Sequence, residues 1–239
     1  MTEFESIRER IAQHRARMEE VPGTWPAKRR LAAALRDLHD CICATDANEE
    51  ELLATARQIE SSARRFAVQP RMENPPGVAE MALAGGMEIF HDRSPLVGLA
   101  NPLAPPLDLE TDMECGVVRG TAIFGNAYEG APGCVHGGFV AAAFDEALGM
   151  ACIFSDNPGM TGELTIRYRK PTPTKTLLRI TARLDRVDRR KIYTSGEIYA
   201  GDLLTAEATG LFISITRSKF GELREEQKRR MANLEAGSD

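Results

Sequence analysis

Apolar residues recur with helical spacing through the first part of the chain. Three stretches repeat an apolar side chain every three or four residues, which is the period of an amphipathic helix. In chain order the stripes are Phe4, Ile7, Ile11 and Met18; Leu31, Leu35, Leu38 and Cys41; and Leu52, Leu53, Ala56, Ile59, Ala63 and Phe66. The pattern predicts a helical extension over residues 1–68 that serves packing or dimerisation rather than catalysis.

Residues that favour helix starts precede each stripe. Two of the three candidate helix starts have the spacing of a capping box, and the third places a proline in the first turn. The three candidate starts are Thr2 with Glu5, Thr24 with Pro26, and Asp46 with Glu49. Residues 69–99 are rich in proline and glycine and predict a linker whose second part wraps over the next domain.

From residue 100 the pattern changes to β-strands around one apolar helix. The strand-like stretches are 117–124, 162–168, 177–187, 192–199 and 203–215, and the helical stretch is 137–154. Turn residues separate the strands, as in Asp156-Asn157-Pro158-Gly159 and Ala200-Gly201-Asp202. One helix against a long antiparallel sheet is an α+β arrangement. We assign it to residues 100–219 and treat residues 220–239 as a charged tail.

The start of the apolar helix is the strongest indication of chemistry. Gly137 and Gly138 follow His136 where backbone N–H groups have no helical acceptor and can stabilise a developing negative charge. Asp145 follows within the apolar run, where burial of an acid is unfavourable. A base and an oxyanion site in one short stretch suggest acyl transfer or hydrolysis. A G-x-S-x-G nucleophile motif is absent, so His136 is expected to shape the loop.

The spacing of these groups predicts a dimer. Gly137 and Asp145 are eight residues apart, which is about 12 Å along a helix. A base and an oxyanion donor that serve one carbonyl must lie within a few ångströms of the same reacting group. One copy of the helix therefore cannot supply both. Two antiparallel copies across a two-fold axis can do so.

Composition narrows the function further. The net charge of −5 gives no general attraction to nucleic acid or anionic membranes. The five cysteines and four histidines are scattered without disulfide or zinc-site spacing. The most apolar stretch, 139–154, contains two acids, and no stretch is expected to reach membrane-spanning length. We expect a cytoplasmic protein with no signal peptide, no membrane span, no metal and no nucleic-acid partner.

A basic strip lies downstream of the helix. Residues 167–191 hold ten Lys or Arg against two Asp. Arg167 and Arg169 should share one strand face, and Arg190 and Lys191 fall in a predicted tight turn. A charged sheet edge that prevents aggregation would have the same composition. Because the same chain also holds a candidate reaction site, we interpret the strip instead as a binding surface for a substrate that carries phosphate groups.

Several motifs occur in a fixed order over residues 100–219. They are YEG at 128–130, GCVHGG at 133–138, Asp145, GMT at 159–161, YRKP at 168–171, LDRV at 184–187, Arg190-Lys191 and AEATGLFI at 206–213. The set resembles the hotdog-fold acyl-CoA thioesterases, in particular the PaaI-like branch with the mitochondrial long-chain enzymes. The resemblance implies a hotdog fold, in which a long antiparallel sheet wraps around one central helix.

The resemblance also implies an activity and a site. It implies hydrolysis of an acyl-CoA in fatty acid metabolism, by a homodimer with shared sites or a tetramer of such dimers. Asp145 would act as base or nucleophile, Thr161 would orient the water, and Gly137 with Gly138 would polarise the carbonyl beside His136. Substrate-binding positions would be Arg167, Arg169, Arg190, Lys191, Tyr193, Thr194 and Ser195. CoA would be part of the substrate, with no separate cofactor.

Two other functions remain as alternatives. The chain would fit a non-catalytic acyl-CoA-binding module, with the helical extension serving a partner. A hotdog enoyl-CoA hydratase is the weaker alternative, because that chemistry relies on a paired Asp and His on one loop. Asp145 and His136 are nine residues apart and too distant in one chain for such a pair. The acyl group stays open at this stage.

Overall fold

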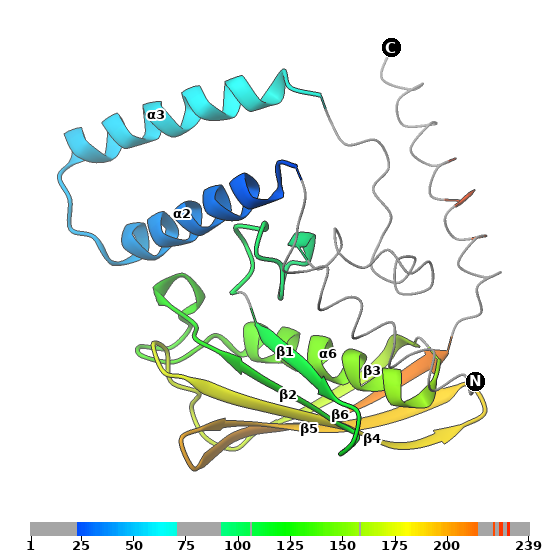
Figure 1. Cartoon of the computed structure of the whole chain (residues 1–239). Coiled ribbons are helices and arrows are strands. Elements are labelled where there is room, and N and C mark those ends of the chain that lie inside the picture. The colour runs from blue at the N-terminus through cyan, green and yellow to red at the C-terminus, as the bar shows by residue number, and fades with distance from the viewer. Residues whose placement is uncertain are drawn as a thin grey trace.

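A single antiparallel sheet curves around one long helix (Figure 1). The structure, a computed structural model, describes residues 23–70, 92–105, 107–157 and 159–214, together with residues 222, 225, 226 and 229. Six strands are hydrogen-bonded in the order β1-β2-β4-β5-β6-β3. Their bounds are β1 (Asp108–Asp112), β2 (Val117–Ala122), β3 (Gly159–Tyr168), β4 (Leu178–Asp188), β5 (Lys191–Ala200) and β6 (Leu203–Ser214).

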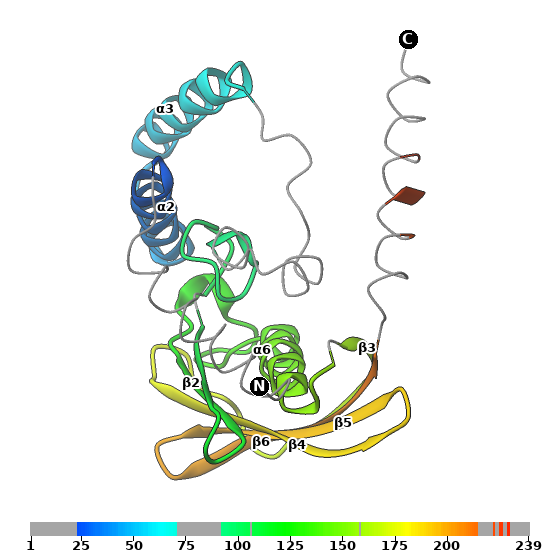
Figure 2. The same cartoon turned by 45° about the vertical axis from the view of Figure 1, so that its right-hand side comes forward.

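Helix α6 (Gly137–Ala151) lies in the hollow of this sheet, as Figure 2 shows. Two short 3₁₀ turns, η1 (Asn126–Tyr128) and η2 (Cys152–Ser155), lie before and after it. The arrangement confirms the predicted α+β fold with one central helix. Strand β3 is an edge of the sheet, because β6 is its only neighbour in the strand order.

Strand β1 (Asp108–Asp112) was not among the predicted strands, and the other five differ from the predicted ones mainly at their ends. Strand β3 begins at Gly159 rather than residue 162, because Gly159 already pairs with Ser214 at the end of β6. The turns between β4 and β5 and between β5 and β6 were predicted correctly. Gly201, between β5 and β6, has a φ of 59°, and Arg189, between β4 and β5, has a φ of 54°. Positive φ suits glycine and is uncommon for arginine.

The core fills the space between α6 and the sheet. Phe144 and Leu148 of α6 and Phe212 of β6 are fully buried. Ala143 and Ala147 are also without exposed surface, so small side chains let the helix approach the strands closely. The small residues of the predicted helix therefore serve packing.

One glycine in β5 marks how closely helix and sheet approach. A Cβ at Gly196 would lie 2.6 Å from the carbonyl oxygen of Thr181 and 3.2 Å from Cδ2 of Leu148. Gly196→Ala should therefore lower the free energy of unfolding by about 1–3 kcal/mol, as overpacking of a core does. Urea unfolding measures this change. The control is Thr165→Ala on β3, because the Thr165 side chain is exposed. Another glycine such as Gly116 would not serve as a control, because its φ of 66° would strain any added side chain.

Helix α2 (Trp25–Ala44) buries Trp25 and Ala32 and also makes polar contacts with the rest of the chain. Nε of Arg29 donates to Oδ1 of the fully buried Asp92 over 2.8 Å, and Nδ2 of Asn126 donates to Oδ2 of Asp40 over 2.9 Å. The predicted apolar face is only partly covered, since Leu31 is 45% exposed whereas Leu35 and Leu38 are partly buried. The start at Thr24 and Pro26 was correct, although the Thr24 side chain makes no cap hydrogen bond.

Helix α3 (Glu49–Ala67) was predicted correctly except at its start. The cap is Asn48, whose side chain accepts a hydrogen bond from the N–H of Glu51 over 2.9 Å. The proposed pair of Asp46 with Glu49 was therefore wrong, because Asn48 lies directly before the helix and already supplies the acceptor. The helix expected near residues 2–18, most of the linker and most of the charged tail lie outside the described residues.

The expectation that no stretch has membrane-spanning character needs correction. Residues 137–155 form 19 helical residues with a mean hydropathy of 1.4, which is long and apolar enough to span by composition. In the structure this segment is α6 with η2, and its buried residues contact the sheet. The helix is apolar because it is packed in the core of the domain.

Candidate active site

The loop before α6 is folded on itself and presents the helix start. Gly130 N–H donates to the carbonyl of Cys134 over 2.9 Å, and His136 N–H donates to the carbonyl of Tyr128 over 2.9 Å. His136 is the N-cap of α6, and its Nδ1 accepts a hydrogen bond from Gly138 N–H over 3.0 Å. The His136 ring thus holds the helix start in place, and the N–H of Gly138 is already occupied.

Gly137 offers the free amide of this helix start. It is the first residue of α6, and within the described part of the chain its N–H has no acceptor. The hydroxyl of Tyr168 donates to the carbonyl of Gly137 over 2.8 Å. A Cβ at Gly137 would lie 3.3 Å from that hydroxyl oxygen. Glycine therefore fits here, and Tyr168, which sequence reasoning placed only within a motif, fixes the peptide from β3.

Asp145 meets Thr161 across the gap between α6 and β3. Thr161 Oγ1 donates to Oδ1 of Asp145 over 2.7 Å. A β-bulge between Thr161 and Glu163 shifts the register of β3. With the extra residue, Thr161 and Leu164 both face α6, whereas regular alternation would turn them to opposite faces. The bulge therefore brings the threonine to the acid.

The two neighbouring acids of α6 differ in their surroundings. Asp145 is exposed in the single chain, whereas Glu146 is only partly exposed. Burial, and secondly the nearby charge of Asp145, raise the pKa of Glu146 from 4.5 to about 7. The expectation that Asp145 is the acid in apolar surroundings is not met within the described part of one chain, where its side chain is exposed.

Glu146 should make stability depend on pH. Its pKa is higher in the folded chain, so the native state binds more protons than the unfolded state between pH 4.5 and about 7. The free energy of unfolding should fall as pH rises through this window, by about 3 kcal/mol in all. Glu146→Gln should remove the fall and be more stable than the parent at pH 8 but not at pH 4.5. Urea unfolding of the parent and of Glu146→Gln at pH 4.5 and pH 8 checks this expectation. An equal difference in the free energy of unfolding between the two proteins at both pH values would contradict it.

Gly137 and Asp145 lie far apart in one chain, as predicted. Both belong to the continuous helix α6, and eight residues correspond to about 12 Å. Tyr168, which contacts Gly137, and Thr161, which contacts Asp145, likewise lie towards opposite ends of β3. A single chain therefore presents two half-sites, one with the acid and one with the free amide.

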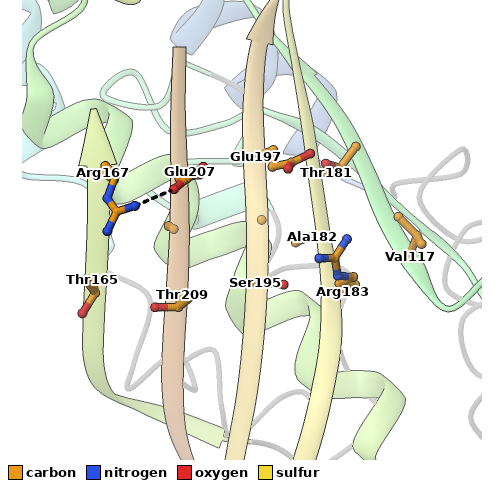
Figure 3. A pocket seen from close by; sticks show the side chains of 12 residues that line it. Val117, Thr165, Arg167, Thr181, Ala182, Arg183, Ser195, Glu197, Glu207 and Thr209 are labelled. Atoms are coloured by element: carbon orange, nitrogen blue, oxygen red, sulfur yellow. Dashed lines mark hydrogen bonds and ion pairs between the residues drawn. The ribbon is translucent and has the colours of Figure 1, made fainter. Parts of the chain in front are cut away.

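The basic residues of β3 face away from these half-sites. Arg167 and Arg169 share one face of the strand and pair with Glu207 of β6, at 3.5 Å and 2.6 Å. Arg167 and Glu207 line a cavity of about 400 Å³ on the sheet face opposite α6 (Figure 3). Sequence reasoning placed Glu207 only within the motif at 206–213 and assigned it no role. Within one chain the structure does not bring Arg167 and Arg169 to Asp145.

The basic turn lies at the same end of the sheet as Asp145. Lys191 pairs with Ile213, which pairs with Met160, the residue before Thr161. Two strand spacings, about 10 Å, therefore separate the backbone of Lys191 from that of β3. Arg190 stays near the sheet, because its guanidinium donates to the carbonyl of Ser214 over 3.3 Å.

The remaining candidate binding residues of β5 point to both faces. Tyr193 lies under the guanidinium of Arg186, 3.7 Å from the ring centroid. Ser195 donates to Asp185 over 2.7 Å. Thr194 is fully buried towards α6, and its hydroxyl has no hydrogen-bond partner within the described residues. Only Thr194 of these three faces the interior between α6 and the sheet.

Comparison with known proteins places the fold and the motifs in one family. Residues 132–207 match the family model of the thioesterase superfamily. The crystal structure of the thioesterase superfamily protein RHA08564 is 34% identical, covers 78% of this chain and 90% of its own, and has a TM-score of 0.69. The chain belongs to the thioesterase superfamily, which confirms the resemblance found in the sequence.

Curated relatives share the segment that holds the candidate site. The acyl-coenzyme A thioesterase THEM4 of Rattus norvegicus is 38% identical over 93 residues, covering 38% of this chain and 40% of the rat protein. THEM4 of Xenopus laevis is 35% identical over 89 residues, covering 36% and 40%. The match thus spans about 40% of the length of these relatives.

Proposed function

We propose that this protein hydrolyses the thioester bond of an acyl-CoA to a free acid and CoA. The single observation that carries the proposal is the Thr161–Asp145 hydrogen bond of 2.7 Å on the α6 face of β3. It fixes one carboxylate oxygen, so that the other is available to a water molecule. The acyl-coenzyme A thioesterases among the relatives support the substrate class.

The chemistry needs only groups that the chain supplies. The carboxylate of Asp145 takes a proton from water, and the water oxygen attacks the thioester carbon. Gly137 N–H stabilises the oxyanion at the start of α6, where the helix dipole also favours negative charge. Collapse of the tetrahedral intermediate breaks the C–S bond and releases CoA thiolate, which is then protonated. Direct attack by Asp145 on the carbon would give the same products through an anhydride.

Each complete site would combine two copies of the chain. Gly137 of one copy would approach Asp145 of the other when two α6 helices run antiparallel. Two observations support this arrangement. Asp145 is exposed in the single chain, and so are most residues of the edge strand β3. Arg190 and Lys191 lie at the same end of the sheet as Asp145, and we assign the CoA phosphates to this turn.

Release of free thiol from a panel of acyl-CoAs tests the proposed activity. Short, long and aromatic acyl chains should be compared, and at least one should release CoA in proportion to enzyme concentration. Binding without release across the panel would instead favour a non-catalytic acyl-CoA-binding module. Addition of water to an enoyl-CoA with the thioester intact would favour a hydratase. Either result would reject hydrolysis.

Mixed dimers test whether the sites are shared. Asp145→Asn and Gly137→Pro should each be almost inactive alone, yet co-expression should restore about one quarter of parental activity, because half of the dimers are mixed and each holds one intact site. In the control mixture, Asp145→Asn is co-expressed with Thr161→Val. Asp145 and Thr161 of one site come from the same copy of the chain, so this mixture should be no more active than Thr161→Val alone. No recovery in the first mixture would reject the shared site.

A further inference from the structure

Helix α2 is anchored to the turn η1 through one carboxylate. Oδ1 of Asp40 accepts a hydrogen bond from the N–H of Asn126, the first residue of η1, and Oδ2 accepts one from Nδ2 of Asn126 over 2.9 Å. A Cβ at the preceding Gly125 would overlap Oδ1 of Asp40. The carboxylate is therefore in direct contact with the backbone of the turn. Figures 1 and 2 both show α2 between α3 and the domain that holds α6.

A second set of contacts links α2 to the same turn through the segment that precedes β1. Nη1 of Arg36 donates to the carbonyl of Asn101 in this segment over 2.9 Å. The carbonyl of Leu103, two residues further on, accepts a hydrogen bond from the hydroxyl of Tyr128 over 3.1 Å. Helix α2 therefore holds both ends of η1, the first residue directly and the last through this segment.

The last residue of η1, Tyr128, packs against the start of α6. Its carbonyl accepts a hydrogen bond from the N–H of His136 over 2.9 Å. Its ring meets the ring of Phe139 edge-on, with 4.9 Å between the two centroids. His136 caps α6, and Phe139 lies in the first turn of that helix. Gly137, the candidate oxyanion donor, lies between these two residues, so η1 supports the helix start on both sides of it.

We propose that Asp40 is a positioning residue for the candidate active site, because it holds Asn126 and, through Tyr128, keeps the N–H of Gly137 in place for the reacting carbonyl. The inference rests on the proposed hydrolysis for its effect on turnover, whereas the contacts stand without it. A misplacement of about 1 Å can lower a rate by about 100-fold, so support from outside the site is enough to matter. Asp40 and Asn126 lie outside residues 132–207, which match the family model.

An exchange of the two side chains tests the contact. Asn126→Asp brings two carboxylates together and should push α2 and η1 apart, because like charges at this separation repel. Adding Asp40→Asn restores both hydrogen bonds with the side-chain donor and acceptor exchanged. The amide of residue 40 then donates to the carboxylate at position 126, and its carbonyl oxygen accepts from the N–H of residue 126. The matched control adds Asp37→Asn instead, which removes a charge from an exposed position of the same helix and should restore nothing.

Release of thiol from a good acyl-CoA substrate measures the effect on turnover. We expect Asn126→Asp to lower kcat by about tenfold with KM nearly unchanged, because a group that acts in the transition state is displaced. The exchanged pair should recover most of this loss. In a Gly137→Pro background Asn126→Asp should cost little more, because the donor that it displaces is already absent. An equal loss in both backgrounds, or no recovery in the exchanged pair, would overturn the proposal.

Hydrogen exchange of backbone amides gives a readout that does not need activity. The N–H groups of Gly130 and His136 should exchange at least several-fold faster in Asn126→Asp and return to the parental rate in the exchanged pair. The N–H of Leu148, towards the other end of α6, should change much less. Unchanged exchange at His136, or an equal rise at Leu148 from a general loss of stability, would overturn the proposal. If the parent releases no thiol from any acyl-CoA, the proposed hydrolysis fails, and the exchange rates still decide whether Asp40 holds the start of α6.

Discussion

Asp145→Asn should lower kcat for acyl-CoA hydrolysis by roughly 10²–10⁴-fold, the range typical for loss of a general base. Asparagine keeps the shape of the side chain and can still accept the hydrogen bond from Thr161, which is 2.7 Å long in the parent. It cannot take a proton from water or attack the thioester carbon. Because Asp145 is exposed in the single chain, fold and CoA affinity should change little.

The measurement is the rate of thiol release with a good substrate, together with a thermal melt and CoA binding. Asp202→Asn is the matched control, since Asp202 lies in the exposed β5–β6 turn and should leave the rate at the parental value. Parental turnover by Asp145→Asn would remove Asp145 from the mechanism, whatever the activity of the chain.

Gly137→Pro should lower kcat by about 10²–10³-fold, as loss of one oxyanion donor does. Proline has no N–H, and the first residue of a helix is the position where proline is best accepted. The preceding His136 has φ −59° and ψ 132°, which is the conformation that a residue before proline favours. The substitution therefore deletes the donor with little change to the helix.

Gly137→Ala separates loss of the N–H from crowding by a side chain. Alanine also adds a Cβ, which would lie 3.3 Å from the hydroxyl oxygen of Tyr168, but it keeps the amide. We expect Gly137→Ala to retain much more of kcat than Gly137→Pro, with both proteins folded by circular dichroism. Equal losses in the two variants would mean that the space at Gly137, rather than its N–H, matters for turnover.

The site could be predicted from sequence where short segments specify it. His136, Gly137 and Asp145 belong to one helix and its cap, so their order along the axis follows from helical geometry. Thr161 was found only through family resemblance, because its approach to Asp145 depends on the bulge in β3. Glu207 was missed, since it comes from β6, 38 residues after Arg169 along the chain.

Sequence reasoning was least accurate where two surfaces had to be matched. The predicted apolar stripe of α2 includes the exposed Leu31, whereas the buried Trp25 and Ala32 lie outside that stripe and Arg29 and Asp40 make the polar contacts. Periodicity shows which side of a helix is apolar, and it does not show which side meets its own domain. The same difficulty applied to the two acids of α6. Asp145 was predicted to lie in apolar surroundings, but it is exposed, and the neighbouring Glu146 is the partly buried acid.

By itself the sequence determined helices α2, α3 and α6, five of the six strands, the turns on either side of β5 and the separation of Gly137 from Asp145. These follow from interactions between residues near one another in the chain, such as helix periodicity, capping and turn conformation. Only the tertiary structure decided that Thr161 reaches Asp145, that Arg167 and Arg169 face away from it, and that α3 is left uncovered. Those outcomes depend on strand register and on how surfaces pack, and each is settled by residues distant in the sequence.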